Sequence, residues 1–471
     1  MSKRLILALL LALQWGLAAA SASLPRDLHS LLDRYRVPDA HIGLYIAPVD
    51  DAANAMVLNP LKPFNPASVI KLLPSIAALE TFSPSYQWPT DVYTTGQVSG
   101  GTLHGNLYLK GGGDPYLTVE AVWAMLKAVH ALGIERIAGD IVVDDHIFKL
   151  PVLDRSAFDG KPYRVYNGPA DGLMVNFWAV SFTITALSDE VHVDAFPASR
   201  QLKIVNKIKH SSSRCTRAHH YVDYDVEDTA TSVVVTFKGV LSEHCPPVLM
   251  TRAVIPADRY LSYILPGLWH DAGGALEGHV RNGFVPDGAK KIYSHPSRSL
   301  AEVVQATNKF SNNLMARHLL LTLGTVDRER GATVTDGVNA LRDWLLDAGI
   351  KVPGLNVMNG SGLSRDTRIS AQALANILRF GYHSRYAPEF LSSMPIAGED
   401  RALKHRSFEE NDASIVRIKT GLLDDVRAMA GYITSRRGRT YIAVLLINHK
   451  GVHRGLGTQM QNAFIQYVLD L

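Results

Sequence analysis

Ser68 and Lys71 stand three positions apart at the start of an apolar stretch. Residues three apart on a helix share a face, so the lysine can hydrogen-bond the serine hydroxyl. A serine is a weak nucleophile until an adjacent base takes its proton. A lysine becomes such a base only when burial or a nearby positive charge lowers its pKa. The pair therefore predicts a serine nucleophile activated by a lysine.

The helix expected over 68–79 is apolar on nearly every face, which is typical of a helix inside a core and would desolvate Lys71. Pro74 predicts a kink or a break into two shorter pieces. Pro66 suits a helix entrance, where free N–H groups can hold an oxyanion. The alternative is an ordinary helix cap with a solvent-reaching lysine, but Lys71 would then be unpaired on an interior helix.

A second short motif, Ser311-Asn312-Asn313, falls within a helical stretch expected over 300–323. Ser311 would relay a proton between Lys71 and a leaving amine, and Asn313 would offer its amide to a substrate carbonyl. The alternative for this motif is a polar helix start.

The third motif, Lys419-Thr420-Gly421, leads into a strand expected over 428–434. Lys419 and Thr420 would bind a terminal carboxylate, and Gly421 would let a substrate backbone lie close to the strand edge. A solvated turn is the alternative. Each motif alone is weak, but the three together, in this order and these settings, specify a site.

The rest of the chain predicts an α/β domain interrupted by a large mixed α/β insert of one or two small domains. The split domain takes 23–88 and 295–471, and the insert takes 89–294. Expected helices in the split domain are 28–35, 334–348, 371–380 and 460–469, and expected strands are 41–47, 55–58 and 440–447. In the insert we expect a helix over 119–132 and strands over 107–109, 141–143, 191–195 and 233–237.

Residues 1–22 read as a secretory signal peptide: Lys3 and Arg4, an apolar run over 5–17, and the small residues Ala20-Ser21-Ala22. An uncleaved anchor helix is the alternative, but the run is shorter than the ~20 residues that span a bilayer. No later stretch is long and apolar enough, so we expect a secreted chain with no transmembrane anchor after cleavage.

The composition, 47% hydrophobic and 20% charged, is that of a globular protein. The net charge of +4 and the lack of a basic run give no indication of a nucleic-acid partner. Cys215 and Cys245, the two cysteines of a secreted chain, predict one disulfide, with two separate buried thiols as the alternative. Since neither CxxC nor HExxH spacing occurs, we expect no metal site, and we expect no cofactor.

The three motifs together are the signature of the penicillin-recognising serine enzymes. Over nearly its whole mature length the chain resembles the D-alanyl-D-alanine carboxypeptidase/endopeptidases of the penicillin-binding-protein-4 type, in which a large insert also separates the first two motifs. The sequences that carry this resemblance are Pro66-Ala67-Ser68, Gly105-Asn106-Leu107-Tyr108-Leu109, Gly113-Asp114-Pro115, Gly139-Asp140-Ile141-Val142-Val143-Asp144 and Gly360-Ser361-Gly362-Leu363-Ser364-Arg365.

The resemblance implies a penicillin-recognising transpeptidase/β-lactamase-like fold and cleavage after D-alanine in peptidoglycan stem peptides and cross-links. It implies acylation of Ser68 by β-lactams and a periplasmic or cell-envelope location. It also implies that Ser361, Leu363 and Arg365 line the cleft and that Tyr166 leans over it from the insert.

The chain departs from the family pattern in two places. Leu422 stands where the family usually has a hydroxyl residue, so a backbone N–H there could still serve an oxyanion while a carboxylate contact is lost. Over 154–166 the side-pocket pattern is loosely kept, with Phe158 and Asp159 as stand-ins. A β-lactamase and a non-catalytic wall-binding protein are the competing functions; the first needs a deacylating carboxylate, and the second has no chemical reason to keep all three motifs.

Overall fold

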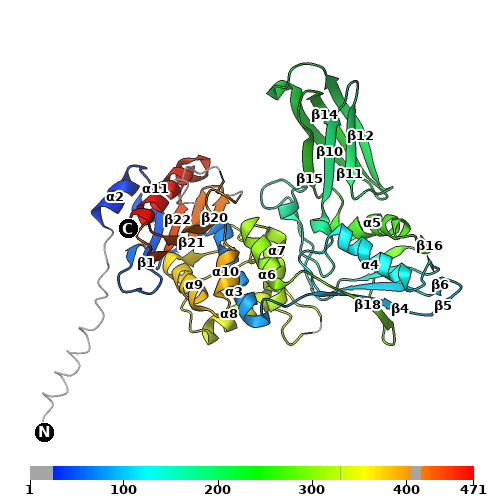
Figure 1. Ribbon diagram of the computed structural model, residues 1–471, viewed down its shortest axis with the longest axis horizontal. Helices are drawn as coiled ribbons and strands as arrows, with labels where there is room; N and C mark the ends of the chain where they lie inside the picture. Colours follow the sequence, from blue (N-terminus) through cyan, green and yellow to red (C-terminus); the bar gives the residue numbers. More distant parts are fainter. Residues whose placement is uncertain (1–24, 329, 401–402, 405–414) are drawn as a thin grey trace, which may run out of the picture.

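The computed structural model describes residues 25–328, 330–400, 403–404 and 415–471, so the signal peptide expected over 1–22 lies outside the described residues. The chain forms two lobes side by side (Figure 1). One lobe contains the first described residues and the C-terminus, and the other contains the inserted segment. Within the described part of the chain, no helix is both long enough and apolar enough to cross a membrane.

The first lobe is built on a five-stranded antiparallel sheet with the order β2-β1-β22-β21-β20. Its strands are β1 (Ile42–Pro48), β2 (Met56–Leu58), β20 (Val416–Leu423), β21 (Val426–Thr434) and β22 (Thr440–Asn448). The strands expected over 41–47, 55–58, 428–434 and 440–447 are confirmed, and β1 pairs antiparallel with β2. The third motif, however, lies within its own edge strand, β20, and does not merely precede a strand.

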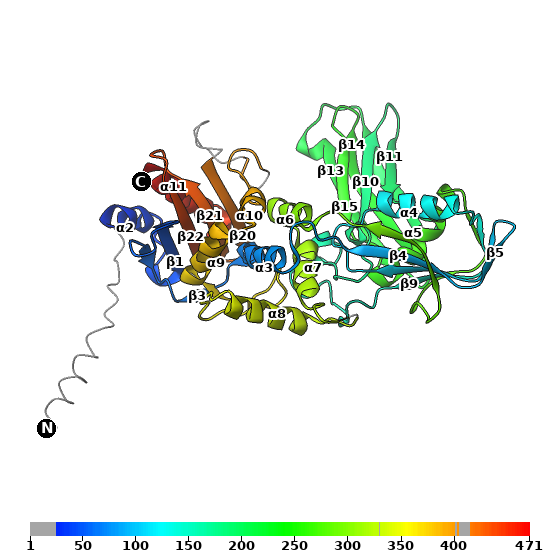
Figure 2. The same ribbon diagram turned by 60° about the horizontal axis from the view of Figure 1, so that its bottom comes forward.

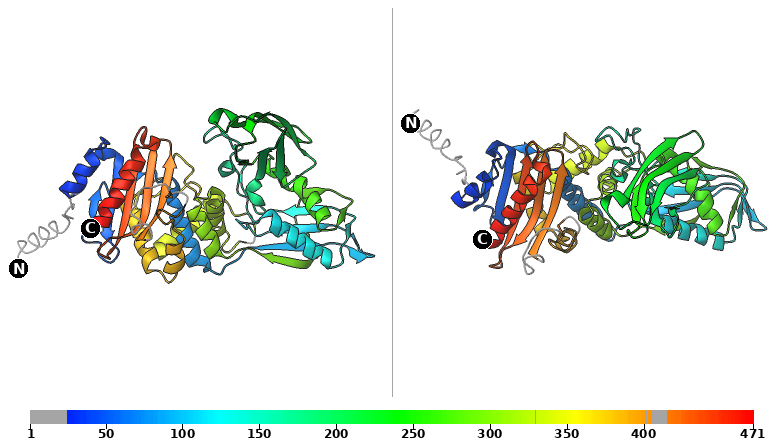
Figure 3. Two further views of the ribbon diagram at one scale, coloured as in Figure 1. Left: turned by 45° about the horizontal axis from the view of Figure 1, so that its top comes forward. Right: turned by 90° about the horizontal axis from the view of Figure 1, so that it is seen from above.

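Side chains of β22 alternate between two cores, because successive residues of a strand point to opposite faces. Ile442, Val444 and Leu446 join one core, while Ala443 and Leu445 join the other. Helices α2 (Arg26–Asp33) and α11 (Leu456–Asp470) cover one face of the sheet (Figure 3). The opposite face carries α3 (Leu72–Phe82), α6 (Leu300–Lys309), α7 (Asn313–Leu323), α8 (Val334–Asp347), α9 (Ala371–His383) and α10 (Ala387–Ser392). A two-stranded ladder, β3 (Pro63–Phe64) with β19 (Ile369–Ser370), joins this layer.

The apolar helix expected over 68–79 is divided at Lys71. A 3₁₀ turn, η2 (Ala67–Lys71), leads into α3. Pro74 falls in the first turn of α3, where its missing N–H would have no intrahelical partner in any case. The predicted break is therefore present, and α3 lies within the first lobe, between the sheet and α7 (Figure 2).

The prediction of one continuous helix over 300–323 is wrong. The chain leaves the helix after Lys309, and Ser311 takes a positive φ of 55° before α7 begins at Asn313. Asn312 caps the new helix, since its side chain accepts a hydrogen bond from the Met315 N–H. The second motif thus occupies the corner between α6 and α7.

The insert leaves and rejoins the first lobe on adjacent strands. β4 (Pro89–Thr94) pairs antiparallel with β18 (Lys290–Pro296), and the Trp88 N–H donates to Ser297 Oγ at 2.9 Å. The insert boundaries at 89 and 294 stay our prediction, with β18 extending two residues past the second.

The sheet order in the insert is β17-β9-β7-β4-β18, and β16-β8-β6-β5 forms a smaller sheet. The remaining bounds are β5 (Gln97–Ser99), β6 (Thr102–His104), β7 (Leu107–Gly111), β8 (Arg136–Ile137), β9 (Ile141–Asp144), β16 (Ala275–Leu276), β17 (Val280–Asn282), α4 (Val119–Ala131) and α5 (Ala257–Asp271).

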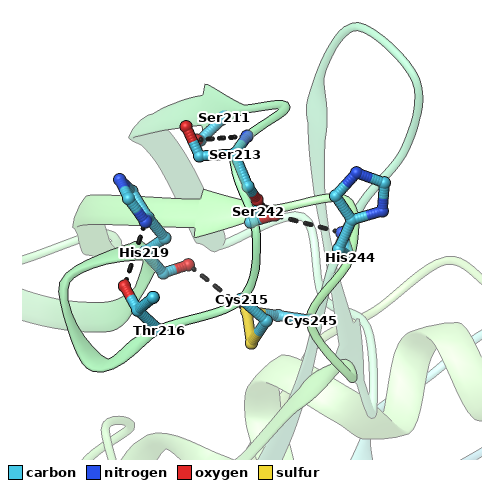
Figure 4. Close-up of a disulfide and its surroundings, with 8 residues drawn as sticks. All are labelled: Ser211, Ser213, Cys215, Thr216, His219, Ser242, His244 and Cys245. Carbon is cyan, nitrogen blue, oxygen red and sulfur yellow. Dashed lines mark hydrogen bonds between the residues drawn. A yellow bond between two sulfur atoms is a disulfide. The ribbon is translucent and has the colours of Figure 1, made fainter.

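The outer β unit, residues 180–252, stands away from this sheet (Figure 1). Its two sheets are β11-β10-β15 and β12-β14-β13, and the rings of Phe182 and Phe237 meet between them with centroids 5.0 Å apart. A disulfide joins Cys215 and Cys245, thus tying the β12–β13 connection to the β14–β15 connection (Figure 4). The strands are β10 (Val180–Ala186), β11 (Val191–Phe196), β12 (Leu202–Ser211), β13 (His220–Asp228), β14 (Val233–Ser242) and β15 (Val248–Arg252).

Candidate active site

Ser68 is the one partly exposed residue in the otherwise buried run from Phe64 to Leu79. It sits at the start of η2, directly after Ala67, whose φ of 44° is unusual for a residue with a Cβ. Asn65 stabilises this turn, because its side-chain oxygen accepts a hydrogen bond from the Ala67 N–H at 2.9 Å. The strained turn presents the Ser68 hydroxyl outward while its neighbours remain in the core.

Lys71 is fully buried, and its ammonium nitrogen has three oxygen partners. It donates to Ser68 Oγ at 2.8 Å, to Asn313 Oδ1 at 2.7 Å and to the Ser361 carbonyl at 2.5 Å. Burial, then the charge of Lys419, then that of Arg317 lower the pKa of Lys71 well below its usual value. Burial and the nearby positive charges thus favour the neutral form of Lys71, which is the form that can act as a base.

Lys419 reaches the same site from the edge strand β20. Its side chain is buried, and Nζ donates to Ser311 Oγ at 2.9 Å and to the Thr420 carbonyl at 3.0 Å. Burial lowers the pKa of Lys419 to about 7. The positive φ of Ser311 turns the second motif toward this lysine, so the three motifs form one connected hydrogen-bonded group.

Gly421 lets β20 lie close to the turn that carries Ser68. A Cβ at this position would lie 2.6 Å from the Pro66 carbonyl oxygen, 2.9 Å from Ala67 Cβ and 3.0 Å from Ser68 N. We expected a substrate backbone to lie close to Gly421, whereas in the structure the chain itself makes the close approach. The outer side of β20 carries Leu422, whose side chain is 52% exposed.

The loop 359–365 supports the site from another side. Ser361 does not present its hydroxyl, which is buried and donates to Asn359 Oδ1 at 2.9 Å; its carbonyl faces Lys71 instead. Leu363 packs beside Ala67 in a small apolar cluster. Arg365 pairs with Asp424 at 3.3 Å.

The insert contributes two aromatic side chains close to these segments. Phe158 packs in the same cluster as Ala67 and Leu363, with the Arg365 guanidinium 4.9 Å from its ring centre. Tyr166, on the turn η3 (Val165–Asn167), donates its hydroxyl to Asp159 Oδ2 at 2.7 Å. Burial and Asp159 raise the pKa of Tyr166 to about 12, which keeps the phenol protonated.

We did not predict two asparagines that support the turn before Ser68. Asn65 and Asn448 exchange hydrogen bonds, from Asn65 N to Asn448 Oδ1 at 2.8 Å and from Asn448 Nδ2 to the Asn65 carbonyl at 3.0 Å. Asn65 Nδ2 also donates to the Ser364 carbonyl at 2.9 Å. The available signal was the pair Asn65-Pro66, since an asparagine before a proline favours the start of a turn.

A serine bonded to a buried lysine on a helix beside an antiparallel sheet, with a second lysine on the edge strand, defines a penicillin-recognising serine enzyme. The chain belongs to the D-Ala-D-Ala carboxypeptidase 3 (S13) family, whose model matches residues 24–467.

Two curated relatives are similar to the chain over most of its length. The D-alanyl-D-alanine carboxypeptidase of Actinomadura sp. (strain R39) is 26% identical over 82% of this chain and 74% of that protein. The D-alanyl-D-alanine carboxypeptidase DacB of Haemophilus influenzae is 24% identical over 81% of this chain and 80% of that protein.

Among solved structures, penicillin-binding protein 4 of H. influenzae has the same fold. The match has a TM-score of 0.78 and 21% identity, and it covers 95% of this chain and 100% of that one. The same protein solved with a bound β-lactam matches with a TM-score of 0.73 over 94% of this chain and 99% of that one, again at 21% identity.

Proposed function

We propose that this chain is a serine D,D-peptidase that cleaves after D-alanine in peptidoglycan stem peptides and their cross-links, with Ser68 as nucleophile and Lys71 as base. Membership of the S13 family supports the D-Ala-D-Ala carboxypeptidase activity. The observation that carries the residue roles is the connected group in which Lys71 bonds Ser68, Asn313 and Ser361 while Lys419 bonds Ser311.

In the acylation step, neutral Lys71 takes the Ser68 hydroxyl proton, and Oγ attacks the carbonyl carbon of the D-alanine residue. The negative charge that develops on the carbonyl oxygen is held by backbone N–H groups of Ser68 and Leu422. A backbone donor at position 422 makes the leucine side chain compatible with this role. The Asn313 amide, already beside Lys71, is placed to orient the substrate.

As the tetrahedral intermediate collapses, the C–N bond breaks and the leaving amine takes a proton. Ser311 relays that proton from Lys71, which returns the base to its neutral form. Lys419 and Thr420 hold the terminal carboxylate of the departing D-alanine through a charge-assisted contact. Water then cleaves the acyl-enzyme ester, and the proton returns to Ser68.

The same acylation of Ser68 by a β-lactam opens the lactam ring, and the ring nitrogen takes the proton. Slow hydrolysis of that ester would make the drug an inhibitor. Among the described residues, no carboxylate hydrogen-bonds Ser68 or Lys71, which favours a peptidase over a β-lactamase.

The rest of the stem peptide would lie against one side of the site, which is formed by Phe158, Leu363, Arg365 and Tyr166. The Tyr166–Asp159 pair offers polar atoms, and Phe158 offers an apolar face under Arg365. Because its substrate lies outside the cytoplasmic membrane, the enzyme is proposed to be exported by its signal peptide and to work at the cell envelope.

The test is Ser68→Ala, assayed with a fluorescent penicillin, intact-mass analysis and D-alanine release. We expect loss of both labelling and release with an unchanged thermal unfolding midpoint. Ser188→Ala, at an exposed loop of the insert, is the matched control and should label like the wild type. A penicilloyl adduct on the Ser68→Ala protein would refute the assignment, and a wild type that binds cell wall without acylation would indicate a non-catalytic protein.

A further inference from the structure

Arg317 is a largely buried arginine on α7 to which the scheme above gives no role. It lies four residues after Asn313, and residues with this spacing share a helix face. Asn313 in turn accepts a hydrogen bond from Lys71 at 2.7 Å. Arg317 is therefore one helical turn behind the amide that contacts the base.

The guanidinium of Arg317 lies where three segments of the site meet. Nη1 donates to the Gly168 carbonyl at 2.5 Å, and Gly168 follows Tyr166 by two residues. Arg317 and Asn359, which holds the Ser361 hydroxyl, line one cavity of about 140 Å³. The other walls of that cavity are mostly apolar: Leu150, Pro151, Leu153, Pro169, Ala170, Leu320, Leu321 and Val334.

No carboxylate among the described residues forms an ion pair with Arg317. Burial lowers its pKa to about 10, so the guanidinium remains charged at neutral pH. Its neighbour His318 is buried, which lowers its pKa, and its ring nitrogens lie 2.8 and 2.9 Å from the carbonyls of Leu314 and Asp171.

The charged groups that act on Lys71 are Lys419 from β20 and Arg317 from α7, and both are cations. On the insert side, the Asp159 carboxylate accepts a hydrogen bond from the Tyr166 hydroxyl. Burial raises the pKa of the carboxyl of Asp171, a residue whose backbone carbonyl contacts His318, to about 7. Among the described residues, neither Lys419 nor Arg317 forms an ion pair with a carboxylate.

We propose that Arg317 is a positioning residue for the peptidase reaction: it fastens the Tyr166–Gly168 segment of the insert to α7 and places a fixed positive charge behind Asn313 that disfavours the protonated form of Lys71. The proposal rests on the proposed acylation of Ser68. In this proposal Arg317 acts on Lys71 without touching the substrate, whereas Lys419 contacts the substrate carboxylate directly.

The experiment measures the second-order rate of labelling by fluorescent penicillin between pH 5 and 9 for the wild type and three variants. Arg317→Met and Arg317→Gln remove the charge, and the glutamine amide can still donate a hydrogen bond near Gly168. Arg317→Lys retains a cation. Loss of one like charge should raise the pKa of Lys71, so we expect the acid limb of the two neutral variants to move up by roughly half to one pH unit, or about three- to tenfold slower labelling at pH 6. The lysine variant should keep the limb near its wild-type position.

Arg328→Met is the matched control, since this arginine lies just beyond α7 and pairs with Asp336 at an exposed site. Its profile should equal that of the wild type. A neutral variant whose rate falls equally at all pH values, with the acid limb unmoved, would show that Arg317 is merely structural and would overturn the proposal. So would a lysine variant that shifts as far as the methionine variant. A wild type that does not label at all would instead refute the proposed function.

Discussion

Strand β22 of the peptidase sheet has seven buried residues among nine, whereas β13 of the outer β unit has none among nine. The first strand is held by two cores, one on each face, and its position is fixed by packing. The second has only one inward side, made of partly buried residues, and its neighbouring connections are tied by the Cys215–Cys245 disulfide. Packing on both faces holds the sheet beside the site, whereas the outer unit packs on one face and adds a covalent bond between two of its connections.

This difference explains where each region tolerates change. Around Ser68, backbone segments lie within contact distance of one another, so one added carbon must displace catalytic atoms. In the outer β unit, most side chains on β12 and β13 face solvent, so a change at the end of one of those side chains displaces few neighbours.

Gly421→Ala should damage catalysis most. Its Cβ would meet the Pro66 carbonyl and Ser68 N at 2.6 and 3.0 Å, and neither backbone atom can move without moving the nucleophile. Since a misplacement of about 1 Å can cost roughly a hundredfold, we expect a loss of that order in the rate of penicillin labelling. Gly267→Ala in α5, where nothing lies within 4 Å of the new Cβ, is the control. Equal labelling by both variants would mean that packing does not fix the site.

Lys419→Ala should cost about ten- to a hundredfold in kcat/KM on a peptide that ends in a carboxylate, because a charge-assisted hydrogen bond contributes roughly 1.5–3 kcal/mol. The same peptide with an amidated end should lose far less. Measuring both substrates with both proteins forms a double cycle. If the two substrates lose equally, Lys419 acts by tuning Lys71 and does not read the carboxylate.

The pH dependence should separate the two lysines. A lysine carries its charge below its pKa, so Lys419, with a pKa of about 7, holds the carboxylate best in acid and loses this ability as the pH rises through 7. The lowered pKa of Lys71 provides the base once the pH exceeds it. We therefore expect a bell-shaped kcat/KM for the carboxylate-ended peptide and a weaker alkaline limb for the amidated one. Parallel profiles would contradict these roles.

Replacing Cys215 and Cys245 together by serine should leave catalysis nearly unchanged. The bond closes a loop with a sequence separation of 30, so the chain-entropy model predicts about 3–4 kcal/mol less stability for the outer β unit. Denaturant unfolding followed by limited proteolysis would locate the loss. A labelling rate that falls in step with stability would mean that the outer unit and the site are coupled.

The sequence identified the three motifs that the structure brings together, because they consist of residue types with few other uses together. It also predicted the two apolar C-terminal strands and the break caused by Pro74. It could not predict the corner at Ser311, because apolar residues run at helical spacing through 300–323 and serine carries no signal for a positive φ.

The remaining errors have a similar cause. The reason for Gly421 lies in a contact with Pro66, which is more than three hundred positions away in the sequence. The role of the Ser361 carbonyl is a backbone property that the side chain does not encode. Helix α5 was not predicted, and Pro266 in its interior obscures the pattern.

The pairing of β4 with β18 also has a consequence for how the chain folds. Because of chain entropy, closing a disordered loop of about two hundred residues costs roughly 2.5 kcal/mol more free energy than closing a loop of about ten residues. When β4 and β18 pair within the insert, that entropy has already been lost, and Trp88 and Ser297 become neighbours, as their hydrogen bonds require. The two parts of the chain that form the five-stranded sheet of the first lobe are then held as close together as the ends of a short hairpin. This geometry favours an order in which the insert folds first and the peptidase domain assembles around its two ends.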